Sequence, residues 1–261
     1  MRKGTTTAGT GLLAAVAGAD DPAGASAPAV PAPAPARAAL WRRAIAEALG
    51  TCLLVAIVVG SGIMAAELSD DAGLQLLANC LATTSGLTVL IAVLGPVSGA
   101  HLNPVVSLVD WFTGRGDGSG LRPAALGVYV AAQVAGGIGG ALLANAMFGV
   151  PAAIATTGRA TAPHLLAEVV ATAGLVLVIL GLLRTDRAVW IPAAVSSWIG
   201  AAYWFTSSTS FANPAVTVGR VFSDTFAGIA PGSVLPFVAA QLAGGALAIA
   251  LAAVLFPRPR P

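Results

Sequence analysis

Charged residues are scarce in this sequence. Lys and Arg together number 13 and Asp and Glu number 11 among 261 residues, whereas 57% of the residues are hydrophobic. A soluble domain usually has roughly a quarter of its residues charged to keep its surface in water. The composition therefore excludes a soluble globular domain and indicates an integral membrane protein whose main partner is the lipid bilayer. The net charge of +2 is too small to indicate a nucleic-acid partner.

Cysteine and histidine are almost absent, with two residues of each. Cys52 and Cys80 both lie in apolar stretches, where a thiol is usually a small buried hydrophobic group. We therefore expect no metal site and no cofactor. An intramembrane hydrolase would need a serine, such as that of Gly60-Ser61-Gly62, to meet His101, but the two lie in different segments. The sequence thus predicts that the protein is not an enzyme.

The two ends of the chain lack long hydrophobic runs. Residues 1–40 are rich in Ala, Gly, Pro, Ser and Thr, a composition that predicts a disordered tail with polyproline character. A short apolar run in this tail, residues 11–17, imitates a signal peptide, but it is weak and two acidic residues follow it, so we do not expect cleavage. Residues 257–261 form a second tail, and residues 41–256 are expected to form a single domain.

Six apolar segments between the tails are each close to the length needed to cross the hydrocarbon core of a bilayer. These segments are 43–66, 75–96, 123–146, 165–183, 189–208 and 233–256. Two further apolar runs, about 103–112 and 213–222, are too short to cross. The sequence therefore predicts an all-α membrane protein with six transmembrane helices and two re-entrant half-helices.

Basic residues fall mostly on one side of the six predicted spans. That side would carry Arg37, Arg42, Arg43, Arg115, Arg122, Arg184, Arg187, Arg258 and Arg260. The opposite side would carry Arg159 together with the acidic residues Glu67, Asp70 and Asp71. Because positively charged loops stay in the cytoplasm, we expect both termini to be cytoplasmic, with the protein in the cell (inner) membrane.

Both short runs begin with the same pair of residues. Asn103-Pro104-Val105 and Asn213-Pro214-Ala215 each place an Asn before a Pro, which is an arrangement that favours the start of a helix. A single Asn-Pro more often marks a turn, so the matching second copy is what supports two helix starts. Irregular backbone inside the membrane is tolerated only where it is packed in protein or lines a water-filled path. Two such starts in corresponding positions indicate a central solute site.

Other pieces of the sequence recur in the same order, which indicates an internal repeat. Ala46-Glu47-Ala48-Leu49-Gly50-Thr51 returns as Ala167-Glu168-Val169-Val170-Ala171-Thr172, and Ala131-Ala132-Gln133 returns as Ala239-Ala240-Gln241. Repeat one would comprise residues 41–146 and repeat two residues 164–256, with three spans in each. Because three is odd, the second repeat must enter the membrane upside down, so the two Asn-Pro starts are expected to meet near the midplane.

Two helix N-termini that meet in this way put two positive dipole ends on the path, and these repel a cation from both directions. Asn103 and Asn213 would offer amide donors to a passing oxygen, and His101 would line or buttress the cytoplasmic half of the path, with pH gating as an alternative. Glu47 and Glu168 are carboxyls within apolar spans, which by default indicates function. One hypothesis is therefore a proton-coupled secondary transporter of a small solute that uses Glu47 or Glu168.

The paired motifs, the lead-in Ser98-Gly99-Ala100-His101-Leu102 and the six-span layout resemble the aquaporin (major intrinsic protein) channels. This resemblance implies a passive channel for small uncharged solutes that excludes ions and protons, aquaporins being the known example of such exclusion. It implies a homotetramer in which each protomer has its own pore. It also implies that Glu47 and Glu168 hold the backbone of the re-entrant loops so that the carbonyls face the pore.

The sequence departs from that family at the expected constriction. Most relatives carry an Arg directly after the second Asn-Pro-Ala, where this chain has Val216. Family spacing places Thr83, Ala201 (or Gly200) and Ser210 at the other constriction positions. The resulting ring would be wider than usual, uncharged and only mildly polar, and so should pass small polyols or neutral hydroxides.

The residues after the second motif bear on both selectivity and solute. Arg220 follows Val216 by one helical turn, and we interpret it either as a displaced guard of the outer mouth or as an interfacial residue that reaches lipid headgroups or caps a loop. The stretches 213–219 and 223–229 resemble a bacterial branch of the family associated with arsenic resistance. That resemblance implies arsenite or a methylarsenical as candidate solutes, beside water and glycerol-like polyols.

Overall fold

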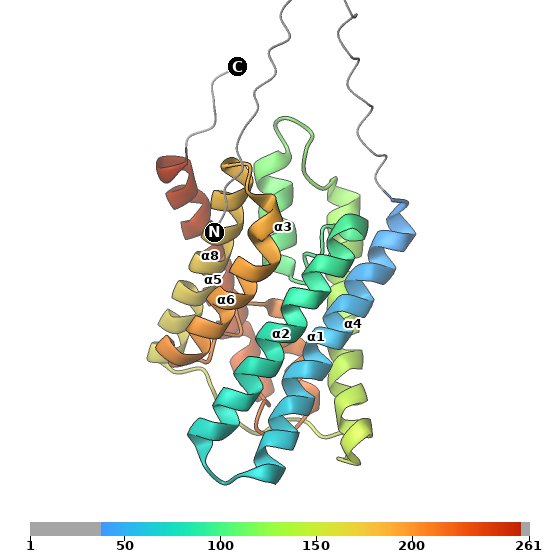
Figure 1. The fold of residues 1–261 in the computed structure, drawn as a ribbon, viewed down its shortest axis with the longest axis vertical. Coiled ribbons are helices and arrows are strands. Elements are labelled where there is room, and N and C mark those ends of the chain that lie inside the picture. Colours follow the sequence, from blue (N-terminus) through green and yellow to red (C-terminus); the bar gives the residue numbers. More distant parts are fainter. Residues whose placement is uncertain (1–37, 257–261) are drawn as a thin grey trace, which may run out of the picture. The chain divides into compact units, whose positions relative to one another are not determined.

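The computed structural model describes residues 38–256. Of the predicted tails, residues 1–37 and 257–261 lie outside the described residues, as do Arg37, Arg258 and Arg260, whereas Leu40, the last residue of the predicted N-terminal tail, already belongs to the first helix. Within residues 38–256 the chain forms helices and no strand, which confirms the all-α prediction. Figure 1 shows long helices running alongside one another, with α3 among them.

Six helices within residues 38–256 are long and apolar enough to cross a membrane. They are α1 (Leu40–Leu68), α2 (Ala72–Ser98), α4 (Pro123–Phe148), α5 (Ala162–Arg184), α6 (Ile191–Phe205) with the 3-10 turn Ala188–Trp190 before it, and α8 (Pro231–Leu255). They confirm the six predicted spans. α6 ends at Phe205 rather than at residue 208 because Thr206 has extended backbone, while its Oγ1 donates to Ala202 O at 2.6 Å.

Two short helices start between the long ones. These are α3 (Pro104–Gly114) and α7 (Pro214–Gly219), which continues as the 3-10 turn Arg220–Phe222. Oδ1 of Asn103 accepts from Val105 N at 2.9 Å, and Oδ1 of Asn213 accepts from Ala215 N at 3.0 Å. Both asparagines are therefore N-caps that satisfy backbone donors left unpaired at a helix start.

Close backbone contacts join the long helices in pairs. In the pair α1 and α4, a Cβ added at Gly136 would clash with Ala48 O. In the equivalent pair α5 and α8, a Cβ at Gly244 would lie 2.6 Å from Val169 O. In lipid, such close packing between helices replaces the hydrophobic drive that water would supply. The sequence repeat relates Gly136 to Gly244 and Ala48 to Val169. The two repeats therefore pack these helices in the same way.

Each half-helix packs against a long helix of the other repeat. A Cβ at Gly137 in α4 would lie 2.5 Å from Ala215 O in α7. A Cβ at Gly245 in α8 would lie 2.7 Å from Cγ1 of Val105 in α3. The small residues on α4 and α8 thus leave room for the first turns of α7 and α3 inside the bundle.

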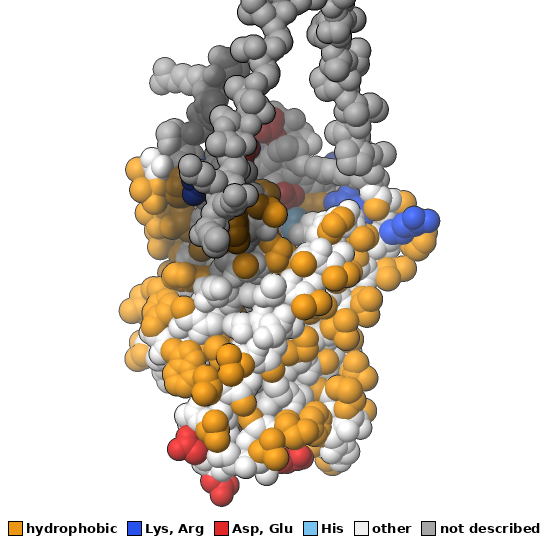
Figure 2. Space-filling view, viewed as in Figure 1, with side chains coloured by type: hydrophobic (Ala, Val, Ile, Leu, Met, Phe, Trp, Pro, Cys, Tyr) orange, Lys and Arg blue, Asp and Glu red, His pale blue; other side chains and the backbone are white. Residues whose placement is uncertain are grey.

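Apolar side chains cover the outside of the bundle. Figure 2 shows them spread along its flank, with acidic side chains at the lower end, where α1 and α2 join. The exposed large apolar residues come from several long helices and include Leu49, Leu81, Val89, Leu166 and Leu235. A soluble protein rarely exposes so much contiguous apolar surface. This belt fits the hydrocarbon region of a lipid bilayer.

Candidate functional site

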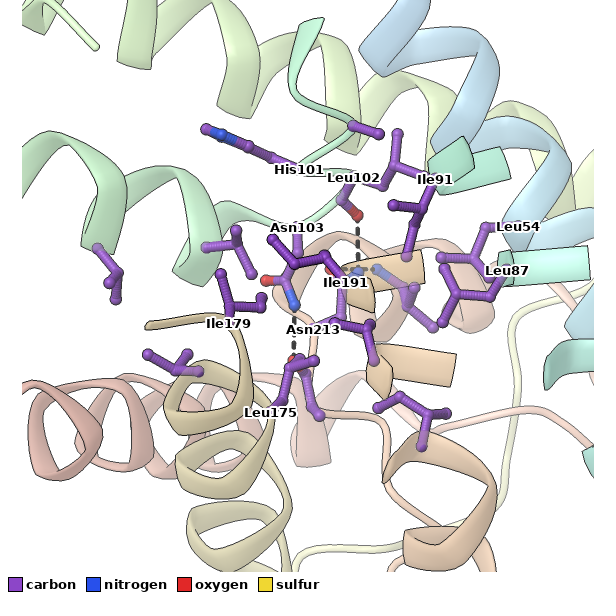
Figure 3. Close-up of a pocket in the computed structure, with 18 of the residues that line it drawn as sticks. Leu54, Leu87, Ile91, His101, Leu102, Asn103, Leu175, Ile179, Ile191 and Asn213 are labelled. Atoms are coloured by element: carbon purple, nitrogen blue, oxygen red, sulfur yellow. Dashed lines mark hydrogen bonds between the residues drawn. The ribbon is translucent and has the colours of Figure 1, made fainter. Parts of the chain in front are cut away.

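The two half-helices point their N-termini at each other. Asn103 Nδ2 donates to Ala212 O at 2.8 Å, and Asn213 Nδ2 donates to Leu102 O at 2.7 Å. Figure 3 shows this reciprocal pair of hydrogen bonds at the centre of the pocket. Each motif therefore binds the backbone that directly precedes the other motif, and the positive ends of two helices lie next to one another.

Each asparagine keeps one donor for a solute. A side-chain amide has two N–H groups and one acceptor oxygen. Oδ1 of each Asn caps its own helix, and within residues 38–256 each Nδ2 makes a single hydrogen bond, across to the other loop. Both asparagines also line the same cavity. The second N–H of each amide is thus available to an oxygen atom that passes through.

The loop before each motif has an unusual backbone. Ala100 and Leu102 in the first loop have φ of 46° and 49°, and Ser210 and Ala212 in the second have φ of 55° and 47°. Residues with a side chain rarely adopt positive φ, which costs on the order of 1–3 kcal/mol each where it is strained. The same two positions before each Asn carry this strain, so other contacts must hold both loops in place.

Glu47 of α1 holds the first loop. Its fully buried carboxylate accepts four hydrogen bonds, from Leu102 N at 2.7 Å, His101 N at 3.0 Å, Ser98 Oγ at 2.6 Å and Gln133 Nε2 at 2.7 Å. These bonds use both oxygens, and they include the backbone N–H of Leu102, one of the residues with positive φ. A carboxylate with this many donors is a brace for the strained loop.

Glu168 of α5 holds the second loop in the same way. It is fully buried and accepts from Ala212 N at 2.8 Å, Phe211 N at 2.9 Å, Ser208 Oγ at 2.7 Å and Gln241 Nε2 at 2.6 Å. The cavity lining, as residues 38–256 form it, includes neither this carboxylate nor its counterpart in α1. Both carboxylates therefore shape the cavity indirectly, by holding the backbone of the two loops, and do not line it themselves.

A cavity of about 290 Å³ passes the two motifs and takes its lining from both repeats. Figure 3 shows the asparagines at its centre with apolar side chains around them. The labelled apolar lining residues are Leu54, Leu87, Ile91, Leu102, Leu175, Ile179 and Ile191. A solute in this cavity can replace its hydration only at a few polar groups, so the cavity disfavours solutes that need a complete hydration shell.

One predicted constriction residue is misplaced. Thr83, Ser210 and Val216 line the cavity, but Ala201 is exposed on the outside of α6. The cavity-facing residues of α6 recur every four positions, at Ile191, Val195, Ile199 and Tyr203. Ala201 lies midway between the last two and therefore on the opposite face of the helix. The prediction for Ala201 is wrong, and Tyr203, whose hydroxyl donates to Thr83 Oγ1 at 3.2 Å, lies at the cavity instead.

The alternative position for that constriction residue also fails. Gly200 is a contact between α6 and α2, because a Cβ added there would lie 2.7 Å from Cγ2 of Thr84. The four-residue spacing of apolar and aromatic residues in α6 is a sequence signal that could have identified Tyr203. Counting back from Asn213 could not, since it assumes a fixed length for the connection between α6 and α7.

Arg220 does not reach lipid headgroups. Its side chain is 5% exposed and lines the cavity. Its Nε donates to Ala227 O, and its guanidinium carbon lies 3.5 Å from the centre of the Phe211 ring. The interfacial interpretation is therefore wrong, while both the loop contact and a position at the cavity are observed.

Comparison with known proteins identifies the family. The family model "Major intrinsic protein" matches residues 35–208, which is most of the chain. The chain belongs to the major intrinsic protein family. It is similar to the aquaglyceroporin AqpS of Rhizobium meliloti, with 50% identity over 223 residues that cover 85% of this chain and 93% of the relative. It is also similar to the aquaporin AqpM of Methanothermobacter marburgensis, with 30% identity over 217 residues that cover 72% of this chain and 86% of the relative.

A solved structure shares the fold. The X-ray structure of the aquaglyceroporin from Plasmodium falciparum superposes with a TM-score of 0.65 at 19% identity, covering 84% of this chain and 98% of that chain. As a major intrinsic protein, the molecule is a multi-pass membrane channel for passive transport and not an enzyme. The matched region ends before the second Asn-Pro-Ala motif, which the geometry around Asn213 nevertheless relates to the first.

A second tyrosine supports the cavity of this major intrinsic protein. His101 lines the cavity, with Nδ1 3.1 Å from Ser107 Oγ and its ring 5.4 Å from that of Tyr129, centre to centre. The buried Tyr129 hydroxyl donates to Ser98 O at 2.6 Å and accepts from Arg43 Nε at 2.8 Å. Sequence reasoning missed Tyr129 as well as Tyr203. These are the two tyrosines of the chain, and each lies in an otherwise apolar span. A phenol hydroxyl in such a span needs a hydrogen-bond partner within the protein, and this requirement could have identified both residues.

Proposed function

We propose that this chain is a passive channel for small uncharged solutes: water, glycerol-like polyols and neutral metalloid hydroxides such as arsenite or methylarsenicals. We propose further that it excludes ions and protons. The observation that carries the proposal is the reciprocal bonding of Asn103 and Asn213 beside the cavity. Membership of a channel family and 50% identity to a protein named an aquaglyceroporin support it.

Ion exclusion follows from the charges that face the cavity. Among the described residues, the ionisable ones in its lining are His101, Asp110, Tyr203 and Arg220. Asp110 belongs to the second half of α3, away from the asparagines, and Oδ2 of its carboxylate accepts from Leu121 N at 2.9 Å. A cation beside the asparagines would therefore meet two helix N-termini and no carboxylate. The amide donors also fix the orientation of each water, which opposes proton hopping.

Three residues of the cavity lining support arsenite and methylarsenicals as solutes. Thr83, Ser210 and Val216 line the cavity, and two of them carry a hydroxyl group and one an isopropyl group. Neutral arsenite carries three hydroxyl groups, as glycerol does, and a methylarsenical adds an apolar face. A lining of this mixed character suits solutes that expose hydroxyl groups on one side and little charge.

Swelling of proteoliposomes in stopped flow tests the function. We expect glycerol and arsenite to enter vesicles that contain the protein at least about tenfold faster than empty vesicles, because the channel lowers the barrier by more than about 1.4 kcal/mol. A channel blocked by Val216→Trp is the matched control. Entry of glycerol at the rate of empty vesicles would contradict the proposed function, whereas entry of glycerol without arsenite would remove only the arsenical part.

We also propose that the channel is a homotetramer in the cell (inner) membrane, with both termini in the cytoplasm. The bias of arginines to one side of the spans supports this orientation, and the tetramer rests on the family resemblance. Labelling a cysteine introduced at Asp71, in the turn between α1 and α2, in a protein whose Cys52 and Cys80 are replaced by Ala tests the orientation. The proposal expects membrane-impermeant reagents to reach it from outside intact cells; labelling only after lysis would reverse the orientation.

A further inference from the structure

Two guanidinium groups lie near the Phe211 ring. The guanidinium carbon of Arg220 lies 3.5 Å from the ring centre, and that of Arg159 lies 5.4 Å from it. Both side chains also donate to carbonyls of the loop that follows α7: Arg220 Nε to Ala227 O, and Arg159 Nε to Gly228 O at 2.7 Å. The two arginines are thus anchored alike, by a ring face and by a loop carbonyl.

The two arginines differ in what else they contact. Arg220 lines the cavity and is 5% exposed, whereas Arg159 is partly exposed and is not part of the lining that residues 38–256 form. Arg159 uses a second nitrogen, since its Nη2 donates to Phe226 O at 3.1 Å. Within the described residues, Arg220 donates only through Nε, which leaves the N–H groups of both Nη atoms for the cavity. A buried cation held without a carboxylate is costly, so its retention needs an explanation.

We propose that Arg220 is the specificity-determining cation of this channel, and that its guanidinium replaces the one missing at Val216. Both residues line the same cavity, and four positions along a helix return to nearly the same face. The charge therefore sits about one turn beyond Val216, in the 3-10 turn that follows α7. This inference rests on the proposed function, because it concerns which solutes that channel admits.

The geometry gives Arg220 two effects on a solute. Its positive charge, in a cavity of low dielectric, repels cations before they reach the asparagines. Its Nη groups donate to oxygen atoms, so neutral solutes with carbonyl or hydroxyl oxygens are received in place of water. The Phe211 ring and the Ala227 carbonyl fix the orientation of the guanidinium plane, so the Nη donors stay directed at the cavity.

Urea and guanidinium are a suitable pair of probes because they have the same planar shape and differ in charge. The wild-type channel is expected to pass urea and exclude guanidinium. Arg220→Gln should raise the ratio of guanidinium to urea uptake by about tenfold or more, since removing a nearby like charge lowers the electrostatic barrier. Arg220→Met, which keeps the apolar stem on Phe211, should behave in the same way.

Three further proteins separate specificity from structure. Arg220→Lys keeps the charge and should still exclude guanidinium. The double variant Val216→Arg with Arg220→Gln restores a guanidinium one turn away and should restore the exclusion. Arg159→Gln removes the other arginine from the same ring and loop, and should leave the ratio of urea to guanidinium flux unchanged.

Two results would overturn the proposed role of Arg220, and a third would overturn the proposed function. Guanidinium uptake at the wild-type level in an Arg220→Gln or Arg220→Met channel that still passes urea would show that Arg220 does not set selectivity. Loss of urea flux in both neutral variants, with Arg159→Gln intact, would assign Arg220 a purely structural role. Absence of urea and glycerol flux in the wild-type protein would instead overturn the proposed function itself.

Discussion

Replacing Glu168 by Gln is expected to abolish solute flux and to lower the melting temperature of the purified protein. Its Oε1 accepts from Ser208 Oγ and Phe211 N, and its Oε2 accepts from Ala212 N and Gln241 Nε2. A side-chain amide would direct its own N–H groups at two of these donors. Each buried donor left unpaired costs about 1–3 kcal/mol, which is large against a total stability of about 5–15 kcal/mol. Circular-dichroism melting and stopped-flow swelling measure the two effects.

Two variants control this experiment. Glu47→Gln removes the equivalent brace of the first loop and should fail in the same way, whereas Glu67→Gln alters an exposed residue near the end of α1 and should change neither flux nor melting. A proton site would behave differently, since Glu168→Gln would then fold normally and lose only gradient-driven uptake. A Glu168→Gln protein with wild-type stability and wild-type glycerol flux would refute the bracing role.

Replacing Val216 by Trp is expected to reduce glycerol and arsenite flux about a hundredfold, which corresponds to a barrier raised by about 3 kcal/mol. Val216 is 5% exposed and lines the cavity in the first turn of α7. An indole at this position must project into a cavity of about 290 Å³, because Gly137 of α4 packs tightly against the backbone of α7 on the other side. Swelling of proteoliposomes in each solute measures the loss.

Val216→Thr is the matched control, because it keeps the size and shape of the side chain and adds only a hydroxyl group. Its glycerol flux should stay within about twofold of the wild type, since the hydroxyl faces a lining that already includes Thr83 and Ser210. Unchanged flux in a well-folded Val216→Trp protein would mean that solutes cross by another route, and the cavity beside Asn213 would lose its assigned role.

The spans and the half-helices could be predicted because their signals are local. An apolar run of membrane length predicts a span, and Asn before Pro predicts a helix start, as at Asn103 and Asn213. The repeat then gave the relation between the two halves. The bracing of each loop by a buried acid followed only from family resemblance, since nothing in the neighbourhood of Glu47 in the sequence indicates that His101 and Leu102 are its partners.

The details of the constriction depend on contacts that sequence spacing does not determine. Ala201 was misplaced because the cavity-facing side of α6 is set by how the helix packs, which brings Tyr203 to Thr83. The position of Arg220 depends on Phe211, nine residues earlier, and on Ala227 in the following loop. Such long-range contacts leave no periodic pattern in the chain, so the sequence left two interpretations of Arg220 open and could not choose between them.

We propose that the two half-helices, which meet at Asn103 and Asn213, lie beside a path that uncharged solutes follow downhill and ions do not. The decisive test is glycerol flux into proteoliposomes, measured with and without a protonophore and paired with current recordings of the same protein in a planar bilayer. We expect glycerol to equilibrate at a rate that the protonophore does not change, with no current above that of the bare bilayer. Glycerol flux that collapses with the protonophore, or a current that accompanies it, would contradict the claim.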